Sequence, residues 1–213
     1  MNNAIFNFAE PRNEPVFEYL PGSRERQLLE KELSEQSSRI VEIPLIIGGK
    51  EIKTGKTINV VNPADHNHVL AVCHMATERE AAMAAEAALE AKNEWMNLAW
   101  MERASILAKA AELISKKYRY KLNAATMLGQ GKNAFQAEID AACEVIDYLR
   151  FNNYFASMIY VEQPKSQDET INRLEYRPLE GFIYTITPFN FTAIASNLNA
   201  SVILMGNTTV WKP

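Results

Sequence analysis

The pattern of hydrophobic and polar positions is clearest between Gly181 and Pro213. Phe182 to Ile186 is a short apolar run of β-prone residues, typical of a strand buried on both faces of a parallel sheet. Pro188 stops that strand, because proline cannot donate to a ladder. From Phe191 to Met205 apolar residues recur at helical spacing up to a Gly206-Asn207 stop, and Thr208 to Trp211 predicts a second strand.

This unit predicts where a ligand binds. A right-handed crossover places the carboxyl ends of both strands at one edge of the sheet, where open α/β sheets bind ligands. The polar turn Thr187-Pro188-Phe189-Asn190 and the side chain of Lys212 should therefore converge at that edge.

Upstream, strand-like runs follow one surface helix. Ser23 is suited to be the N-cap of a polar helix from Arg24 to Ser37. Ile40–Ile47 and Glu51–Lys53 predict a hairpin around Gly48-Gly49. Further strands are expected at Thr57–Val61 and Val69–Cys73, with His66 and His68 in a polar turn between them.

The middle of the chain predicts a series of helices. Thr77 and Glu80 form a capping box, after which alanine-rich sequence continues to about Trp95. Apolar residues at helical spacing predict the other helices, at Met101–Lys117, Lys121–Leu128 and Phe135–Ile159. Gly129 to Ala134 matches G-x-G-x-x-A, but it follows a helix rather than a strand, so we interpret it as a helix–helix turn that uses positive φ at glycine.

Composition excludes several classes of function. The chain of 213 residues is 47% hydrophobic and 23% charged, and its net charge of -4 gives no electrostatic footprint for nucleic acid or an anionic membrane. The N-terminus is neither a signal nor a transit peptide by composition, so we expect a cytoplasmic protein. Cys73 and Cys143 are interpreted as buried hydrophobes, and no metal is expected, because the histidines lack a closed four-ligand set.

Two late motifs resemble those of the aldehyde dehydrogenase superfamily: T-P-F-N-F-T, from Thr187, and V-W-K-P at the end of the chain. With G-Q-G-K and A-E-I-D upstream, the chain is similar to the branch that oxidises L-glutamate γ-semialdehyde, formed from 1-pyrroline-5-carboxylate. The resemblance implies an α/β fold in which a helical middle precedes the start of a Rossmann-like parallel sheet. It runs from about Leu45 to the last residue.

Pattern and resemblance together divide the chain into segments. An N-terminal extension with the surface helix covers 1–39, and strands and helices of the N-terminal region cover 40–160. An extended arm covers 161–180, and 181–213 is the first strand-helix-strand of the NAD-binding sheet. In the family such an arm pairs with another subunit, so the resemblance implies a homo-oligomer.

The resemblance also implies roles at the sheet edge. Asn190 would hold the oxyanion formed on an aldehyde, although it is also a plausible N-cap of the following helix. Lys212 would donate to the ribose hydroxyls of NAD, unless it is simply a solvated lysine. Thr187 and Pro188 would approach the cofactor, flanked by Ile186 and Phe189. NAD rather than NADP is expected from the branch alone.

Two more residues are expected to contact the substrate. Phe191 would be the aromatic wall against the aliphatic part of the semialdehyde, with a core phenylalanine as the alternative. Glu138 would lie near the substrate entrance, with a glutamate on an exposed helix face as the alternative.

The nucleophilic Cys and the general-base Glu of the family lie downstream of the matched motifs. We therefore expect this chain to be an N-terminal part that is inactive by itself. Because only two parallel strands are predicted, the isolated chain should also self-associate through its open sheet edge. The alternatives are part of a generalist aldehyde dehydrogenase, or a non-catalytic module that binds a nucleotide or a partner.

Overall fold

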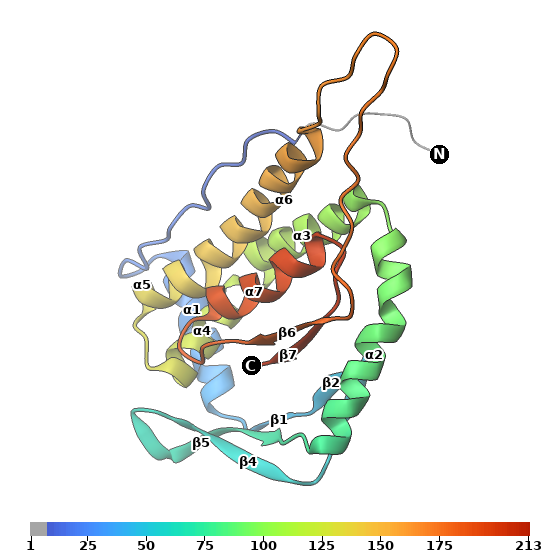
Figure 1. Ribbon diagram of the computed structural model, residues 1–213. Coiled ribbons are helices and arrows are strands. Elements are labelled where there is room, and N and C mark those ends of the chain that lie inside the picture. The colour runs from blue at the N-terminus through green and yellow to red at the C-terminus, as the bar shows by residue number, and fades with distance from the viewer. Residues whose placement is uncertain (1–7) are drawn as a thin grey trace.

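The structure, a computed structural model, describes residues 8–213 and has a body of packed helices with small sheets beside it (Figure 1). The body contains α3 (Trp100–Leu113), α4 (Arg119–Gln130), α6 (Val145–Val161) and α7 (Thr192–Leu204). Its apolar core is built largely from small residues and aliphatic side chains, which are Ala104, Leu107, Ala111, Val145, Ile146, Leu149, Ala156, Ala193, Ala200 and Leu204. Close approach of the helices follows from the many alanines.

Two π-helical turns lie within the helical middle of the chain. The sequence predicts a break between two helices at the first and one continuous helix at the second. The turn η1 (Ile114–Tyr118) runs α3 directly into α4, so the predicted break between Lys117 and Lys121 is wrong. The turn η2 (Glu138–Glu144) joins α5 (Ala134–Ala137) to α6. Gly131 ends α4 with φ of 68°, which confirms the glycine turn expected there.

The N-terminal strands form a sheet and a separate hairpin. Strand β5 (Asp65–His74) lies between β4 (Thr57–Asn62), which is antiparallel to it, and β1 (Val41–Ile43), which is parallel to it. The hairpin pairs β2 (Leu45–Ile47) with β3 (Lys50–Ile52).

Two expectations for this region are wrong. The predicted strand Ile40–Ile47 splits at Pro44, which has no N–H to donate, so its first part pairs with β5 instead of entering the hairpin. His66 and His68 lie in β5 rather than in a turn, since that strand begins at Asp65.

Two predicted helix starts are confirmed. Ser23 caps α1 (Arg24–Ser37) by accepting a hydrogen bond from the Arg26 N–H, and α1 packs against α4. At the start of α2 (Glu78–Asn97), the Glu80 carboxylate accepts from the Thr77 N–H at 2.9 Å.

The C-terminal unit has the predicted order and direction. Strands β6 (Ile183–Ile186) and β7 (Thr209–Lys212) are parallel, and α7 connects them. Helix α7 ends in a Schellman motif, in which the Gly206 N–H donates to the Ile203 carbonyl and the Asn207 N–H to the Val202 carbonyl. The predicted stop is therefore confirmed.

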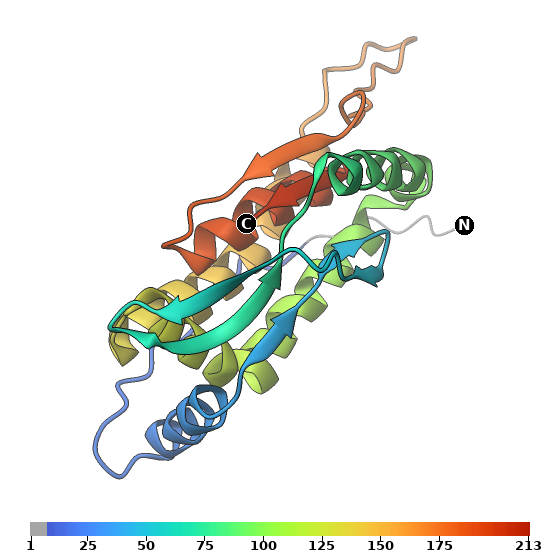
Figure 2. The same cartoon turned by 90° about the horizontal axis from the view of Figure 1, so that it is seen from below.

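Between α6 and β6 a long arm leaves the body and returns (Figure 1), and the view from below shows it extending past the ends of the helices (Figure 2). Its only described pairing is an isolated bridge between Gln167 and Thr170. Ile171, Leu174 and Leu179 expose apolar side chains along it.

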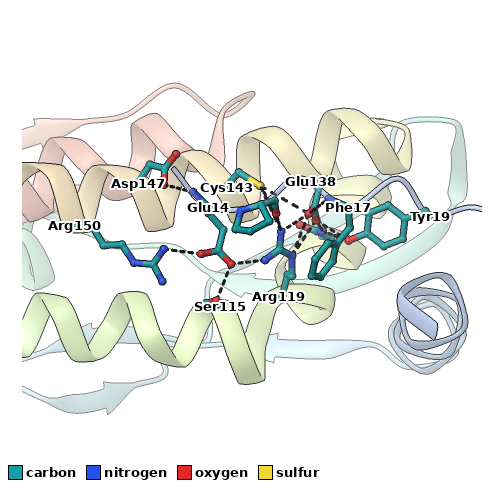
Figure 3. A network of polar contacts seen from close by, with 11 residues as sticks. Glu14, Phe17, Tyr19, Ser115, Arg119, Glu138, Cys143, Asp147 and Arg150 are labelled. Carbon is teal, nitrogen blue, oxygen red and sulfur yellow. Dashed lines mark hydrogen bonds and ion pairs between the residues drawn. The ribbon is translucent and has the colours of Figure 1, made fainter. Parts of the chain in front are cut away.

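A buried ion-pair network connects the segment before α1 to the helical body (Figure 3). The Arg119 guanidinium, whose side chain is 2% exposed, bonds to the carboxylates of Glu138 and Glu14 and to the Pro15 carbonyl. Arg150 donates to the other oxygen of Glu14 at 2.6 Å.

The Glu138 carboxylate is fully buried and has several donors besides Arg119. The Tyr19 hydroxyl donates to it at 2.6 Å, the Asn123 amide at 2.7 Å and the Phe17 N–H at 2.9 Å. Burial raises the pKa of Glu138, but the bonds from Arg119 and Tyr19 outweigh burial and leave the pKa below its ordinary value of 4.5.

We predict that Gly206→Ala destabilises the fold by about 1–3 kcal/mol. Gly206 has φ of 85°, and a Cβ there would approach the Pro178 Cγ to 2.8 Å. Gly129→Ala is the matched control, because that glycine is helical and an added Cβ meets nothing within 4 Å. Urea unfolding measures both; equal stability of the two variants would contradict the strain at Gly206.

A second prediction concerns acid. Because the pKa of Glu138 is lower in the folded state, its ionised carboxylate stabilises the fold at pH values above 4.5. As the pH falls through 4.5 the unfolded state binds more protons, and this stabilisation is lost as the pH approaches the lower pKa of the folded state. Glu138→Gln should lower the free energy of unfolding at neutral pH by about 2–3 kcal/mol and flatten its decline between about pH 6 and pH 3. The exposed Glu90→Gln is the control, and an unaltered pH profile in Glu138→Gln would contradict the assignment.

Candidate functional site

The predicted residues gather where β6 ends. In the parallel pair Ile186 is opposite Lys212, so the turn that follows Ile186 and the side chain of Lys212 share one edge, as expected. The Thr187 N–H donates to the Lys212 carbonyl at 3.2 Å, which extends the pairing one residue beyond the strand.

Side chains at this edge differ in exposure. Phe189 is 91% exposed, and Ile186 and Lys212 are also exposed, whereas Thr187 is buried. The Thr187 hydroxyl accepts a hydrogen bond from the Trp211 indole at 3.0 Å, so it fixes the two strand ends to each other. The Lys212 ammonium donates to the Pro213 carbonyl at 2.9 Å.

The structure decides against an N-cap at Asn190. The cap position of α7 belongs to Phe191, whose ring cannot accept a hydrogen bond. Asp140 supplies the missing acceptors from another helix: its carboxylate takes the Thr192 N–H at 3.1 Å and the Ala193 N–H at 2.9 Å. Within residues 8–213 the side-chain amide of Asn190 is exposed and makes no hydrogen bond.

Lys132 also holds this turn, and sequence reasoning assigned it no role. Its ammonium donates to the Asn190 carbonyl and to the Asp140 carboxylate, both at 2.7 Å. It lies 4.1 Å from the centre of the Phe191 ring, which is exposed rather than part of the core. The sequence contained a signal for both residues, since Lys132 belongs to the G-Q-G-K motif and Asp140 to the A-E-I-D motif on which the resemblance to the branch depends.

Glu138 is not brought to the turn. The alternative of an exposed helix face is wrong, because the Glu138 carboxylate is 0% exposed and is bonded to Arg119, Tyr19 and Asn123. The helical sequence around Glu138 gives no sign that its hydrogen-bond partners include Tyr19, which lies more than a hundred residues earlier in the chain. Contact with a substrate stays a prediction for this residue.

The cysteines have structural settings. Cys143 is buried in η2, where burial and the nearby Glu138 carboxylate raise the pKa of its thiol to about 12. Such a thiol is not ionised at neutral pH and is a poor nucleophile. Cys73 lies in β5, half-buried.

The described part of the chain has neither a metal-binding cluster nor a helix that could span a membrane. Residues 8–213 contain no group of three or more His, Cys, Asp and Glu side chains placed to hold a metal ion. None of the helices in that range combines the length and apolar character needed to cross a bilayer.

Curated relatives match almost the whole chain. A probable delta-1-pyrroline-5-carboxylate dehydrogenase of Schizosaccharomyces pombe is 50% identical over 99% of this chain, which covers 39% of that protein. The mitochondrial delta-1-pyrroline-5-carboxylate dehydrogenase of Homo sapiens is 43% identical over 94% of the chain, which covers 36% of it. The chain thus spans under two fifths of the length of these relatives.

Solved structures agree. The delta-pyrroline-5-carboxylate dehydrogenase of Mycobacterium tuberculosis, bound with NAD, superposes on the entire chain with a TM-score of 0.97 at 47% identity, and the match covers 40% of that protein. A 1-pyrroline-5-carboxylate dehydrogenase from Thermus with bound NAD gives 0.87 at 28% identity over 98% of this chain and 40% of its own. The family model described as "Aldehyde dehydrogenase family" matches residues 51–213, and the chain therefore belongs to that family.

Proposed function

We propose that this chain is part of an NAD-dependent enzyme that oxidises L-glutamate γ-semialdehyde, formed from 1-pyrroline-5-carboxylate, to L-glutamate. The observation that carries the proposal is the 50% identity to a probable delta-1-pyrroline-5-carboxylate dehydrogenase along 99% of the chain. The exposed Asn190 amide beside β6 supports it, because it is a donor with no partner in the described chain. A role in proline degradation follows from this substrate.

The reaction defines what the turn must do. A nucleophile adds to the aldehyde carbon, and the carbonyl oxygen then carries negative charge that needs hydrogen-bond donors. The Asn190 side chain offers an N–H₂ group at the carboxyl edge of the sheet, where that oxygen would lie. NAD, when bound, accepts the hydride that leaves the same carbon. The nucleophile is assigned to no residue of this chain.

The residues at the edge fit a dinucleotide. Lys212 presents an exposed ammonium that can donate to ribose hydroxyls, and Ile186 and Phe189 leave apolar surface beside it. The relatives of known structure from Mycobacterium tuberculosis and Thermus have NAD bound. Pro188, half-buried between Thr187 and Phe189, sets the path of the backbone past that surface.

The assembly and the compartment belong to the proposal as well. A homo-oligomer is supported by the apolar side chains exposed along the arm. The cytoplasm is the proposed compartment, whereas the names of the relatives from Dictyostelium discoideum and Homo sapiens include the word mitochondrial.

The activity is tested in the complete protein, meaning this sequence together with the length that its relatives have beyond the matched part. We expect kcat/KM for L-glutamate γ-semialdehyde to exceed that for propanal by at least about tenfold, because propanal lacks the α-amino acid group. The assay is NADH formation. Comparable values for both aldehydes would favour a generalist aldehyde dehydrogenase, and no turnover would favour a non-catalytic binding module.

Two substitutions should separate chemistry from cofactor binding in the complete protein. Asn190→Ala should lower kcat by about 10²–10³ and leave the Kd for NAD nearly unchanged, because the oxyanion exists only along the reaction path. Lys212→Ala should weaken NAD binding with a smaller effect on the chemical step. Each variant is the control for the other, through NAD titration and single-turnover rates; the reverse pattern would refute both assignments.

A further inference from the structure

Two charged side chains hold the backbone that follows the Asn190 Cα, on both sides of Phe191. Ahead of the helix, the Lys132 ammonium donates to the Asn190 carbonyl at 2.7 Å. At the start of α7, the Asp140 carboxylate accepts hydrogen bonds from the N–H groups of Thr192 and Ala193 at 3.1 and 2.9 Å. Lys132 and Asp140 also bond directly to each other, at 2.7 Å. The two peptide units that flank Phe191 are thereby held by one ion pair, and the first of them carries the Asn190 carbonyl.

This ion pair is sheltered from water. The side chains of Lys132 and Asp140 are 17% and 4% exposed, so the attraction between them is screened less than at an open surface. Burying the carboxylate requires a compensating partner, which the ammonium and the two N–H groups provide. The face of the Phe191 ring, 4.1 Å from the ammonium, adds a cation–π contact on the remaining side.

The Asn190 side chain has no such support of its own. Its amide makes no hydrogen bond within residues 8–213, so its direction depends on the backbone to which it is attached. That backbone follows Pro188 and leads into α7, and the Asn190 carbonyl is held by Lys132. A donor that must meet a developing charge needs a defined position, and an error of about 1 Å can cost about 10²-fold in rate.

We infer that Lys132 and Asp140 are positioning residues that aim the Asn190 amide at the reacting oxygen. The inference rests on the proposed function, because it gives Asn190 the oxyanion role. Lys132 acts through the Asn190 carbonyl, and Asp140 acts by holding Lys132 and the first turn of α7. Neither residue is required to touch the substrate or NAD.

Loss of Lys132 should leave the fold in place. The start of α7 keeps its bonds to Asp140, and the Thr192 hydroxyl keeps its contacts with Thr126 at 3.0 Å and with the Gln130 amide at 3.1 Å. What disappears is the bond to the Asn190 carbonyl and the charge that balances Asp140. The effect should therefore appear in the rate more than in the integrity of the protein.

The test is Lys132→Met in the complete protein, measured with L-glutamate γ-semialdehyde and NAD. We expect kcat to fall about tenfold to a hundredfold, with the Kd for NAD within about twofold of the parent. Lys132→Arg, which keeps a charged donor, should recover most of the rate. Asp140→Asn is the second variant if Lys132→Met does not fold, and it should also lower kcat.

Lys92→Met is the matched control. Lys92 is 13% exposed and donates to the Leu179 carbonyl at 2.7 Å, so it resembles Lys132 in its own burial and in its bond to a backbone carbonyl, whereas its carboxylate neighbour Glu180, at 3.7 Å, is exposed. It is distant in sequence from the turn and bonds to none of its residues. A merely structural role for Lys132 predicts that both substitutions lower thermal stability and kcat to a similar extent.

The decisive comparison is the double variant with Asn190→Ala. If Lys132 acts through the amide, Lys132→Met should lower kcat by less than about twofold when that amide is already absent. The inference would be overturned if the effects of Lys132→Met and Asn190→Ala on kcat were fully additive, or if Lys132→Met had the same kcat as Lys92→Met. In either case a low kcat in Asn190→Ala would leave the proposed function standing. A normal kcat in Asn190→Ala itself would overturn the oxyanion role of Asn190 and, with it, the inference, but not the proposed activity.

Discussion

The burial of one positive charge, that of Arg119, constrains the rest of this structure. A guanidinium that is 2% exposed cannot lose its proton, so it must be surrounded by acceptors. The chain supplies Glu138 from η2 and Glu14 and the Pro15 carbonyl from the segment before α1. Glu14 and Pro15 lie more than a hundred residues before Arg119, so meeting around one cation brings three parts of the chain to fixed relative positions.

The same π-helical turn also serves the candidate site. Glu138 faces the Arg119 network, whereas Asp140, two positions later, faces the start of α7 and bonds to Lys132. One short segment is thus bonded to the N-terminal part of the chain and to the turn that bears Asn190. The family model begins at residue 51, yet residues before it supply donors and acceptors to this interior.

Local signals in the sequence predicted local structure well. The strand-helix-strand unit, the cap at Ser23 and the stop at Gly206 depend on neighbours within a few residues, and the structure has all three. The convergence of Lys212 with the turn after β6 followed from the handedness of parallel connections. The family resemblance came from the same short stretch of sequence.

Properties that depend on distant partners were not predictable in this way. The alternative of an exposed helix face for Glu138 fails because nothing near it in sequence identifies Tyr19 or Phe17 as donors. The alternative of an N-cap at Asn190 fails because the sequence gives no hint that Asp140 supplies the acceptor at the start of α7. The two alternatives fail for one physical reason: the fold chooses a hydrogen-bond partner, and a pattern of residues shows only which groups need one.

The π-helical turns impose a condition on the length of the chain. A π turn contains more residues than an α turn, and an α-helix rotates by about 100° per residue. Removing one residue from Glu138–Glu144 while η2 relaxes to α-helical geometry would leave α6 close to its present rotation about the helix axis, because the wider π turn is what accommodates the additional residue. Val145, Ile146 and Leu149 would then keep their places in the core. A deletion within α6 itself has no wider turn to compensate for it and would rotate every later side chain by about 100° relative to the body. The segment η2 is therefore the place where this helix tolerates a change in the number of residues.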